Sequence, residues 1–246
     1  MSIDSEEDRE GIRRVGRVVG EALRAMARDT RAGVTTADVD AAGAEVFRAH
    51  GARSAPQLVY DFPAVNLISV NDEIVHGIPG SRRLRPGDVV KLDVTAELDG
   101  YIADAATTVV IPPAGGQALR LQACAVAAFD AACEAARAGR LVSGIGAAVE
   151  ARVKASGFAV VRALTGHGVG RTIHEAPSVP NFYDRWQRDR LTEGMVLTIE
   201  PIISERACRV VEGRDGWTLS THNGCLAAHH EHTLIITSGA PELVTA

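Results

Sequence analysis

The chain has little lysine, an excess of acidic residues and no long hydrophobic run. Only 2 of its 26 basic residues are lysine, and 31 acidic residues give a net charge of −5 over 246 residues. This acidity argues against a dedicated nucleic-acid-binding protein, whose surface would be basic. No stretch of about 18 apolar residues occurs, which argues against a membrane-spanning segment. Residues 1–14 hold no apolar core, so we expect no secretory signal.

Cysteines and aromatic residues are also few. Four cysteines lie 9, 75 and 17 positions apart along the chain, at Cys124, Cys133, Cys208 and Cys225. This spacing contains no Cys-x-x-Cys pair and does not predict a zinc finger. We therefore expect reduced, buried thiols and a cytoplasmic location. Aromatic residues make up only 4% of the chain, so Ala, Val, Leu and Ile must form most of the core.

The hydrophobic pattern predicts helices followed by strands, twice along the chain. Helical spacing of apolar residues predicts helices at 7–28, from Thr35 or Thr36 to Gly51, at 117–138 and at 143–155. A loop-rich stretch surrounds Pro56 and Pro63. Strands are expected at 67–70, 89–96, 101–111, 159–164, 195–200, 208–212 and 232–236.

Two segments of the chain share one pattern. Residues 83–93 (RLRPGDVVKLD) and 190–200 (RLTEGMVLTIE) both read Arg-Leu-x-x-Gly-x-Val-x-x-apolar-acid. Asp93 and Glu200 then occupy equivalent positions at the inner ends of two strands. We therefore expect a single α+β domain, residues 1–246, built from two pseudo-symmetric halves at about 1–112 and 116–246.

The Asp99-Gly100 dipeptide predicts a tight hairpin between two apolar strands. A two-residue turn at this point pairs Thr95 with Asp104, and Asp93 has the same parity as Thr95. Asp93 and Asp104 therefore share one face of the sheet as diagonal neighbours, with Cβ atoms about 7–8 Å apart. Two carboxylates on an otherwise apolar face are unfavourable without compensation. A solvent-exposed face of the hairpin is the alternative explanation.

Three further residues favour a metal site over that alternative. Glu200 ends an apolar strand, Glu231 precedes the apolar run 234–236, and His167 lies among glycines that let the backbone approach a bound group closely. Four clustered carboxylates repel one another unless cations lie between them. Two divalent cations with a bridging hydroxide would balance that charge. The pattern therefore predicts a two-metal hydrolytic site, with ions about 3.5–4 Å apart.

Six motifs carry a family resemblance. They are SVNDEIVHGIP at 69–79, GDVVKLD at 87–93, GHGVGR at 166–171, HEAP at 174–177, TIEP at 198–201 and EHT at 231–233. In this order and spacing they resemble methionine aminopeptidase, type I, of the creatinase/aminopeptidase superfamily. The resemblance spans nearly the whole chain. It implies a duplicated "pita-bread" fold, with a curved antiparallel sheet flanked by two pairs of helices, and removal of N-terminal methionine from peptides and nascent proteins.

The resemblance also implies a role for individual residues. It implies that five residues bind the metal ions: Asp93, Asp104, His167, Glu200 and Glu231. Of these, Asp104 and Glu231 would bridge both ions. It implies three catalytic residues: His76, His174 and Glu200. Glu200 would act as the proton shuttle. Substrate-binding residues are implied at His76, His174, Phe62, Ile173 and Trp217.

The implied ligand set also bears on the metal and the partners. Carboxylates with one imidazole and no thiolate suit manganese, iron(II) or cobalt(II), with zinc as a further candidate. We expect a monomer that acts on the N-terminus of a peptide or nascent protein, in transient proximity to the ribosome. Neither nucleic acid nor a membrane is an expected partner.

The chain departs from the family's common residues at six positions that leave the five ligands in place. They are Ile102 for His, Ala103 for Gly, Phe62 for Tyr, Ile173 for Phe, Val75 for Cys and His229 for Gln. These changes affect the pocket wall and not the metal ligands. The sequence therefore predicts hydrolytic activity more firmly than it predicts specificity for methionine.

Three alternatives remain open at this point. The chain could be an aminopeptidase of the same superfamily with another specificity, such as Xaa-Pro, or a non-catalytic binding protein on this fold. A separate zinc site at 229–232 is disfavoured, because strand alternation places His230 and His232 on the face opposite Glu231.

Overall fold

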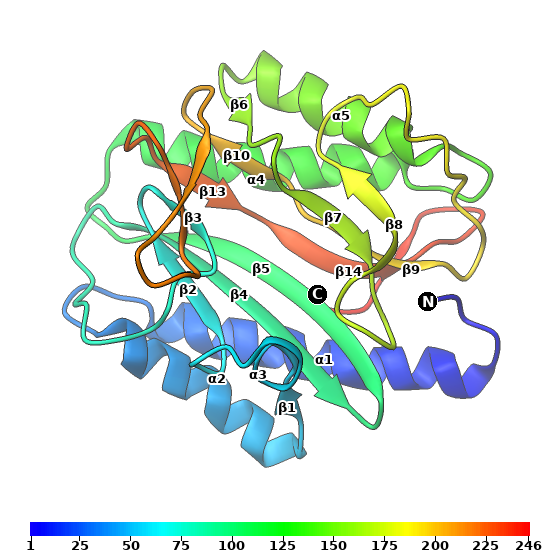
Figure 1. Ribbon diagram of the computed structural model, residues 1–246, viewed down its shortest axis with the longest axis horizontal. Coiled ribbons are helices and arrows are strands. Elements are labelled where there is room, and N and C mark those ends of the chain that lie inside the picture. The colour runs from blue at the N-terminus through cyan, green and yellow to red at the C-terminus, as the bar shows by residue number, and fades with distance from the viewer.

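The structure of the protein is a computed structural model that describes residues 1–246. Its helices are α1 (Glu6–Asp29), α2 (Thr36–His50), α3 (Ala55–Tyr60), α4 (Gly116–Ala135) and α5 (Val142–Ala155). Figure 1 shows α1 and α2 (blue) along one half of a curved sheet and α4 and α5 (green) along the other half. None of these helices has the length and apolar content needed to cross a membrane.

The main sheet has nine strands, and every strand pair in it is antiparallel. They are β1 (Arg53–Ser54), β2 (Leu67–Val70), β4 (Val89–Leu98), β5 (Tyr101–Val110), β7 (Thr165–Gly168), β8 (Glu175–Pro180), β9 (Val196–Ile199), β14 (Glu231–Ile235) and β15 (Glu242–Leu243). The order is β1-β4-β5-β14-β9-β7-β8, with β2 beside β4 and β15 beside β14. This is the α+β pita-bread arrangement that the family resemblance implied.

Two small sheets complete the fold. One joins β6 (Ala159–Val160), β10 (Ile202–Ser204) and β13 (Ala227–His229). The other joins β3 (Glu73–Val75), β11 (Val210–Glu212) and β12 (Leu219–Thr221).

Local sequence signals explain several helix ends. The Ser5 hydroxyl accepts a hydrogen bond from the Asp8 backbone at the start of α1, and Thr35 and Asp38 form a capping box at the start of α2. Gly51 ends α2 with φ of 70°. The predicted end of α4 is wrong by three residues, because the chain turns at Ala136 and then pairs with the segment after β14.

The central hairpin has the predicted register. Thr95 pairs with Asp104 and Asp93 pairs with Ala106. Asp99 and Gly100 have φ values of 53° and 80°, as a two-residue hairpin turn requires. Asp93 and Asp104 therefore lie on the same face of the sheet, as the sequence predicted.

The shared sequence pattern makes the same contacts in both halves. The Arg83 guanidinium donates to the Gly33 carbonyl oxygen at 2.7 Å, and the Arg190 guanidinium donates to the Gly139 carbonyl oxygen at 2.9 Å. The leucine after each arginine is 1% exposed. One core lies under α1 and α2 and a second under α4 and α5. These parallels support the proposed division into two pseudo-symmetric halves.

The sequence predicted the short elements less well. Residues 55–60, expected in a loop, form α3, which the Ser54 side chain caps. The strand expected at 159–164 is limited to β6, and the one expected at 208–212 begins only at Val210. The strand expected at 195–200 is β9, which is one residue shorter at each end, and the one expected at 232–236 is β14, which begins and ends one residue earlier. The remaining short strands were not predicted, because tertiary pairing rather than local pattern decides such segments.

Candidate metal centre

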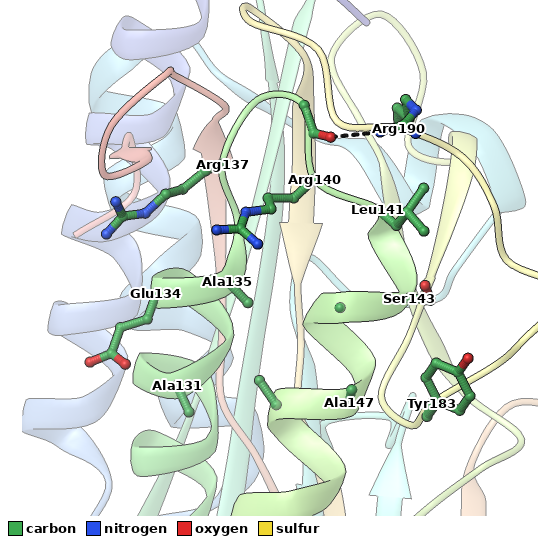
Figure 2. A pocket seen from close by; sticks show the side chains of 13 residues that line it. Ala131, Glu134, Ala135, Arg137, Arg140, Leu141, Ser143, Ala147, Tyr183 and Arg190 are labelled. Carbon is green, nitrogen blue, oxygen red and sulfur yellow. Dashed lines mark hydrogen bonds between the residues drawn. The ribbon is translucent and has the colours of Figure 1, made fainter.

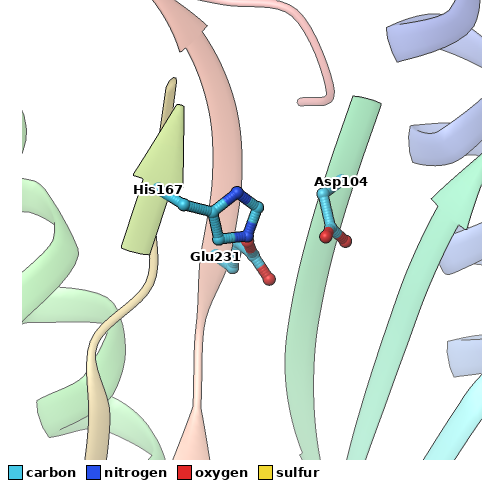
Figure 3. Close-up of side chains that lie close together, drawn as sticks. All are labelled: Asp104, His167 and Glu231. Atoms are coloured by element: carbon cyan, nitrogen blue, oxygen red, sulfur yellow. The ribbon is translucent and has the colours of Figure 1, made fainter. Parts of the chain in front are cut away.

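The five predicted ligands line one cavity of about 130 Å³ at the inner face of the sheet. They come from β4, β5, β7, the end of β9 and the start of β14: Asp93, Asp104, His167, Glu200 and Glu231. Figure 3 shows Asp104, His167 and Glu231 projecting toward a common point from three different strands. The fold thus brings together residues from both halves of the chain.

Four of the five predicted ligands fall into two groups whose ligand atoms are close enough to share cations, and Asp93 belongs to neither group. One ligand atom each from Asp104, His167 and Glu231 lies within 4.8 Å of the others. Glu200, His229 and Glu231 form a second such group, and Glu231 belongs to both. His167 Nε2 lies 3.8 Å from Glu200 Oε1, which links the two groups.

The carboxylates of this cluster hold their protons more tightly than exposed acids do. Burial raises the pKa of Asp104 to about 7, against hydrogen bonds that lower it. Burial, followed by the charge of neighbouring carboxylates, raises the pKa of Asp93, Glu200 and Glu231 well above their usual values. Divalent cations would relieve this repulsion. The donor set of this site therefore fits a pair of such ions.

The imidazole of His167 is oriented for metal binding. Its Nδ1 lies 2.9 Å from the Gly168 carbonyl oxygen, so Nδ1 carries the proton and donates. Burial lowers the pKa of His167 to about 4, which keeps the ring neutral. The Nε2 lone pair therefore faces the carboxylates, as in a histidine ligand with an outer hydrogen-bond partner.

Neighbouring backbone and hydroxyl groups fix these ligands in place. The Thr95 hydroxyl donates to Asp104 Oδ1 at 2.9 Å, and the Asp104 backbone N–H donates to the Thr233 hydroxyl at 2.8 Å. A Cβ at Gly168 would lie 2.2 Å from the Ala176 carbonyl oxygen. Only glycine therefore permits the close strand contact beside His167.

A second cavity of about 240 Å³ opens onto this cluster. The five predicted substrate-binding residues all line it: Phe62, His76, Ile173, His174 and Trp217. Asp93 and Asp104 line both cavities. The Phe62 and Trp217 rings meet edge to face with centroids 5.1 Å apart. An apolar recess thus ends at the carboxylates.

The sequence did not identify two residues of this region. Tyr60 lines the apolar cavity, and its hydroxyl lies 2.6 Å from His174 Nδ1. It belongs to α3, which was not predicted. His229 was treated as a departure from the family and as part of a disfavoured separate zinc site, yet it lines the cavity of the cluster. Its separation of two positions from Glu231 was the available signal, because such residues share a strand face.

His230 and His232 lie elsewhere, as strand alternation predicted. Each ring packs against Phe129 with centroids 5.2 Å apart. His232 Nδ1 also lies 2.9 Å from the Thr245 hydroxyl oxygen. Neither belongs to the groups that could hold an ion.

A larger groove of about 770 Å³ runs between α4 and α5 and includes none of the predicted site residues. Figure 2 shows Arg137, Arg140 and Arg190 around it, with Glu134 and Tyr183 further along. Arg190 is engaged with the Gly139 carbonyl oxygen. The groove has no cluster of metal-ligating side chains, so size alone does not make it the reaction site.

Known proteins resemble this chain over its full length. Residues 10–238 match the model of metallopeptidase family M24. The chain is 40% identical to methionine aminopeptidase 2 of Bacillus subtilis, covering 100% of this chain and 99% of that protein. It resembles the methionine aminopeptidase structure from Thermotoga maritima with a TM-score of 0.96, at 32% identity, covering 100% and 99% of the two chains. The Rickettsia prowazekii methionine aminopeptidase structure gives 0.94 at 32% identity, covering 100% of both chains.

Proposed function

The chain belongs to metallopeptidase family M24, among its methionine aminopeptidases, and on this basis we propose that the carboxylate–histidine cluster is its two-metal catalytic centre. The enzyme hydrolyses the peptide bond after an N-terminal methionine. The arrangement that supports this site best is the apolar cavity that opens directly onto the cluster, with Asp93 and Asp104 shared between the two cavities.

Five residues would hold the metal pair, with Asp104 and Glu231 bridging: Asp93, Asp104, His167, Glu200 and Glu231. Four carboxylates and a neutral imidazole form an oxygen-rich set that suits manganese, iron(II) or cobalt(II), with zinc also able to bind. When bound, the ions supply a water-derived nucleophile at neutral pH and polarise the scissile carbonyl.

The proton steps fall to side chains of this chain. Glu200 takes a proton from the attacking water and returns it to the leaving amine. His174 donates a hydrogen bond to the developing oxyanion, and His76 hydrogen-bonds the scissile amide. Both histidines line the apolar cavity beside the cluster, and burial lowers the pKa of each, which favours neutral rings.

The apolar cavity would receive the methionine side chain. Phe62 and Ile173 are 3% and 4% exposed and form two of its walls, and Trp217 forms another. These surfaces offer apolar contact without a hydrogen-bond partner, which suits a thioether side chain. The departures from the family at Phe62 and Ile173 lie in this wall, so they would tune selectivity rather than hydrolysis.

The setting of the enzyme is part of the proposal. We infer a cytoplasmic monomer that acts on peptides and on nascent chains close to the ribosome. Residues 1–246 would form one catalytic domain, in which each half contributes ligands to the metal pair.

The direct test uses protein stripped of metal and reloaded with manganese(II) or cobalt(II). We expect hydrolysis of Met-Ala-Ser at its first peptide bond and little hydrolysis of an Ala-Pro peptide. Faster cleavage of Ala-Pro would instead indicate an Xaa-Pro enzyme. Failure to bind any divalent ion after reconstitution would indicate a non-catalytic binding protein.

A further inference from the structure

His229 is a buried histidine that is not one of the five proposed metal ligands. It lies at the end of β13 and is 1% exposed. Neither of its ring nitrogens has a hydrogen-bond partner. A buried polar group without a partner is unfavourable and calls for an explanation, such as a bound ion.

The ring points at two of the proposed ligands. His229 Nε2 lies 3.5 Å from Glu200 Oε2 and 3.4 Å from Glu231 Oε2. These separations are long for hydrogen bonds. They match two ligand atoms that each lie about 2.1 Å from a common ion at a near-tetrahedral angle, which are about 3.4 Å apart. The three side chains also form one of the two groups whose ligand atoms lie together.

The backbone holds this orientation firmly. The His229 N–H donates to the Thr108 hydroxyl at 2.9 Å, and that hydroxyl donates to the His229 carbonyl oxygen at 2.7 Å. These two bonds hold the His229 backbone against β5, the strand that carries Asp104. On the other side of Glu200, Oε1 faces His167 Nε2 at 3.8 Å. Glu200 thus lies between two imidazoles.

We propose that His229 is a sixth protein ligand of the metal centre, binding through Nε2 the ion that Glu200 and Glu231 hold. This inference rests on the proposed two-metal site and adds a second imidazole to it. Imidazole favours cobalt, zinc and iron, whereas manganese favours oxygen ligands. His229 therefore shifts the metal preference of this chain away from manganese.

The matched variants are His229→Gln and His230→Gln. Glutamine keeps a polar side chain of similar length but removes the imidazole. His230 is the neighbouring, half-buried histidine, and its ring packs against Phe129 rather than the cluster. Both variants are compared with the wild type after metal removal, with circular dichroism as the check on folding.

The first readout is the proton NMR spectrum of the cobalt(II)-loaded proteins in water. Imidazoles bound to cobalt give strongly shifted, exchangeable ring N–H signals. We expect two such signals in the wild type and in His230→Gln, and one in His229→Gln. A single signal in the wild type overturns the proposal while leaving the five-ligand centre intact, and it does not depend on any variant folding.

The second readout is calorimetric titration with cobalt(II), zinc(II) and manganese(II). We expect His229→Gln to weaken one cobalt or zinc site about 10- to 100-fold and to change manganese binding much less. Equal affinities in the wild type and His229→Gln overturn the proposal. If the wild type binds no divalent ion, the proposed function fails together with this inference.

Discussion

The Tyr60 hydroxyl oxygen lies 2.6 Å from His174 Nδ1 and joins the last turn of α3 to the loop before β8. Partial burial raises the pKa of Tyr60, so its phenol stays protonated and donates to Nδ1. The neutral His174 ring then carries its own proton on Nε2. That tautomer is the one able to donate to a developing oxyanion in the cavity.

Removal of the Tyr60 hydroxyl should therefore slow the reaction. Tyr60→Phe leaves Nδ1 without its donor, so the Nε2-protonated tautomer and the ring orientation are no longer enforced. We expect kcat for Met-Ala-Ser to fall about 10-fold, with bound metal unchanged. Tyr183→Phe is the control, because Tyr183 is 58% exposed and lies in the groove beside α5. A Tyr60→Phe enzyme within twofold of the wild type would show that the contact has no catalytic role.

Loss of a bridging carboxylate should separate metal binding from folding. Asp104→Asn keeps an oxygen that can accept from the Thr95 hydroxyl but removes one negative charge. We expect at most one bound ion per chain and a loss of at least 100-fold in kcat. The matched control is Asp99→Asn at the turn of the same hairpin, where the side chain is 64% exposed. Two tightly bound ions in Asp104→Asn would contradict the bridging role.

The stability of the metal-free protein should fall as the pH rises. The pKa of Asp104 is about 7 and those of Asp93, Glu200 and Glu231 are raised well above usual values, so above about pH 7 the folded apoprotein binds more protons than the unfolded chain. The histidines whose pKa burial lowers are mostly neutral in both states at that pH, so they do not offset this difference. The free energy of unfolding then decreases with pH over that range. We expect a lower Tm at pH 8.5 than at pH 7 by calorimetry.

Saturating cobalt(II) or manganese(II) should remove this dependence, because the ions compensate the carboxylate charge. Asp104→Asn should show a shallower slope without metal. A Tm of the metal-free wild type that rises over the same pH interval would mean that the carboxylates are not packed together in solution.

The pocket wall should govern binding more than turnover. Trp217 meets Phe62 edge to face, and we expect Trp217→Ala to raise KM for Met-Ala-Ser about 10-fold with a smaller change in kcat. Apolar wall contacts stabilise the bound substrate and the transition state similarly, so their loss should raise KM more than it lowers kcat. Trp186→Ala is the control, because Trp186 is 70% exposed. An unchanged KM would place the methionine side chain elsewhere.

The centre of the site was predictable because its signals are local. The Asp99-Gly100 turn sets the register of β4 and β5, and strand parity then places Asp93 and Asp104 on one face. The two Arg-Leu segments make equivalent contacts, which is consistent with the two pseudo-symmetric halves that the sequence repeat predicts.

The remaining parts depend on tertiary contacts that local pattern does not encode. Tyr60 reaches His174 across 114 positions, through a short helix that the surrounding prolines obscured. The strands β7 and β8 contain Gly166, Gly168 and Pro177, which are poor strand residues. They pair because neighbouring strands supply partners, and glycine alone allows the backbones to approach.

The most direct test of the two-metal site is a crystal structure of the protein grown with cobalt(II), with anomalous difference maps recorded at the cobalt edge. Two peaks about 3.5–4 Å apart are expected among Asp93, Asp104, His167, Glu200 and Glu231, with Asp104 and Glu231 contacting both. Fully loaded, active enzyme that shows no ion among these side chains, or ions bound only elsewhere on the molecule, would contradict the assignment.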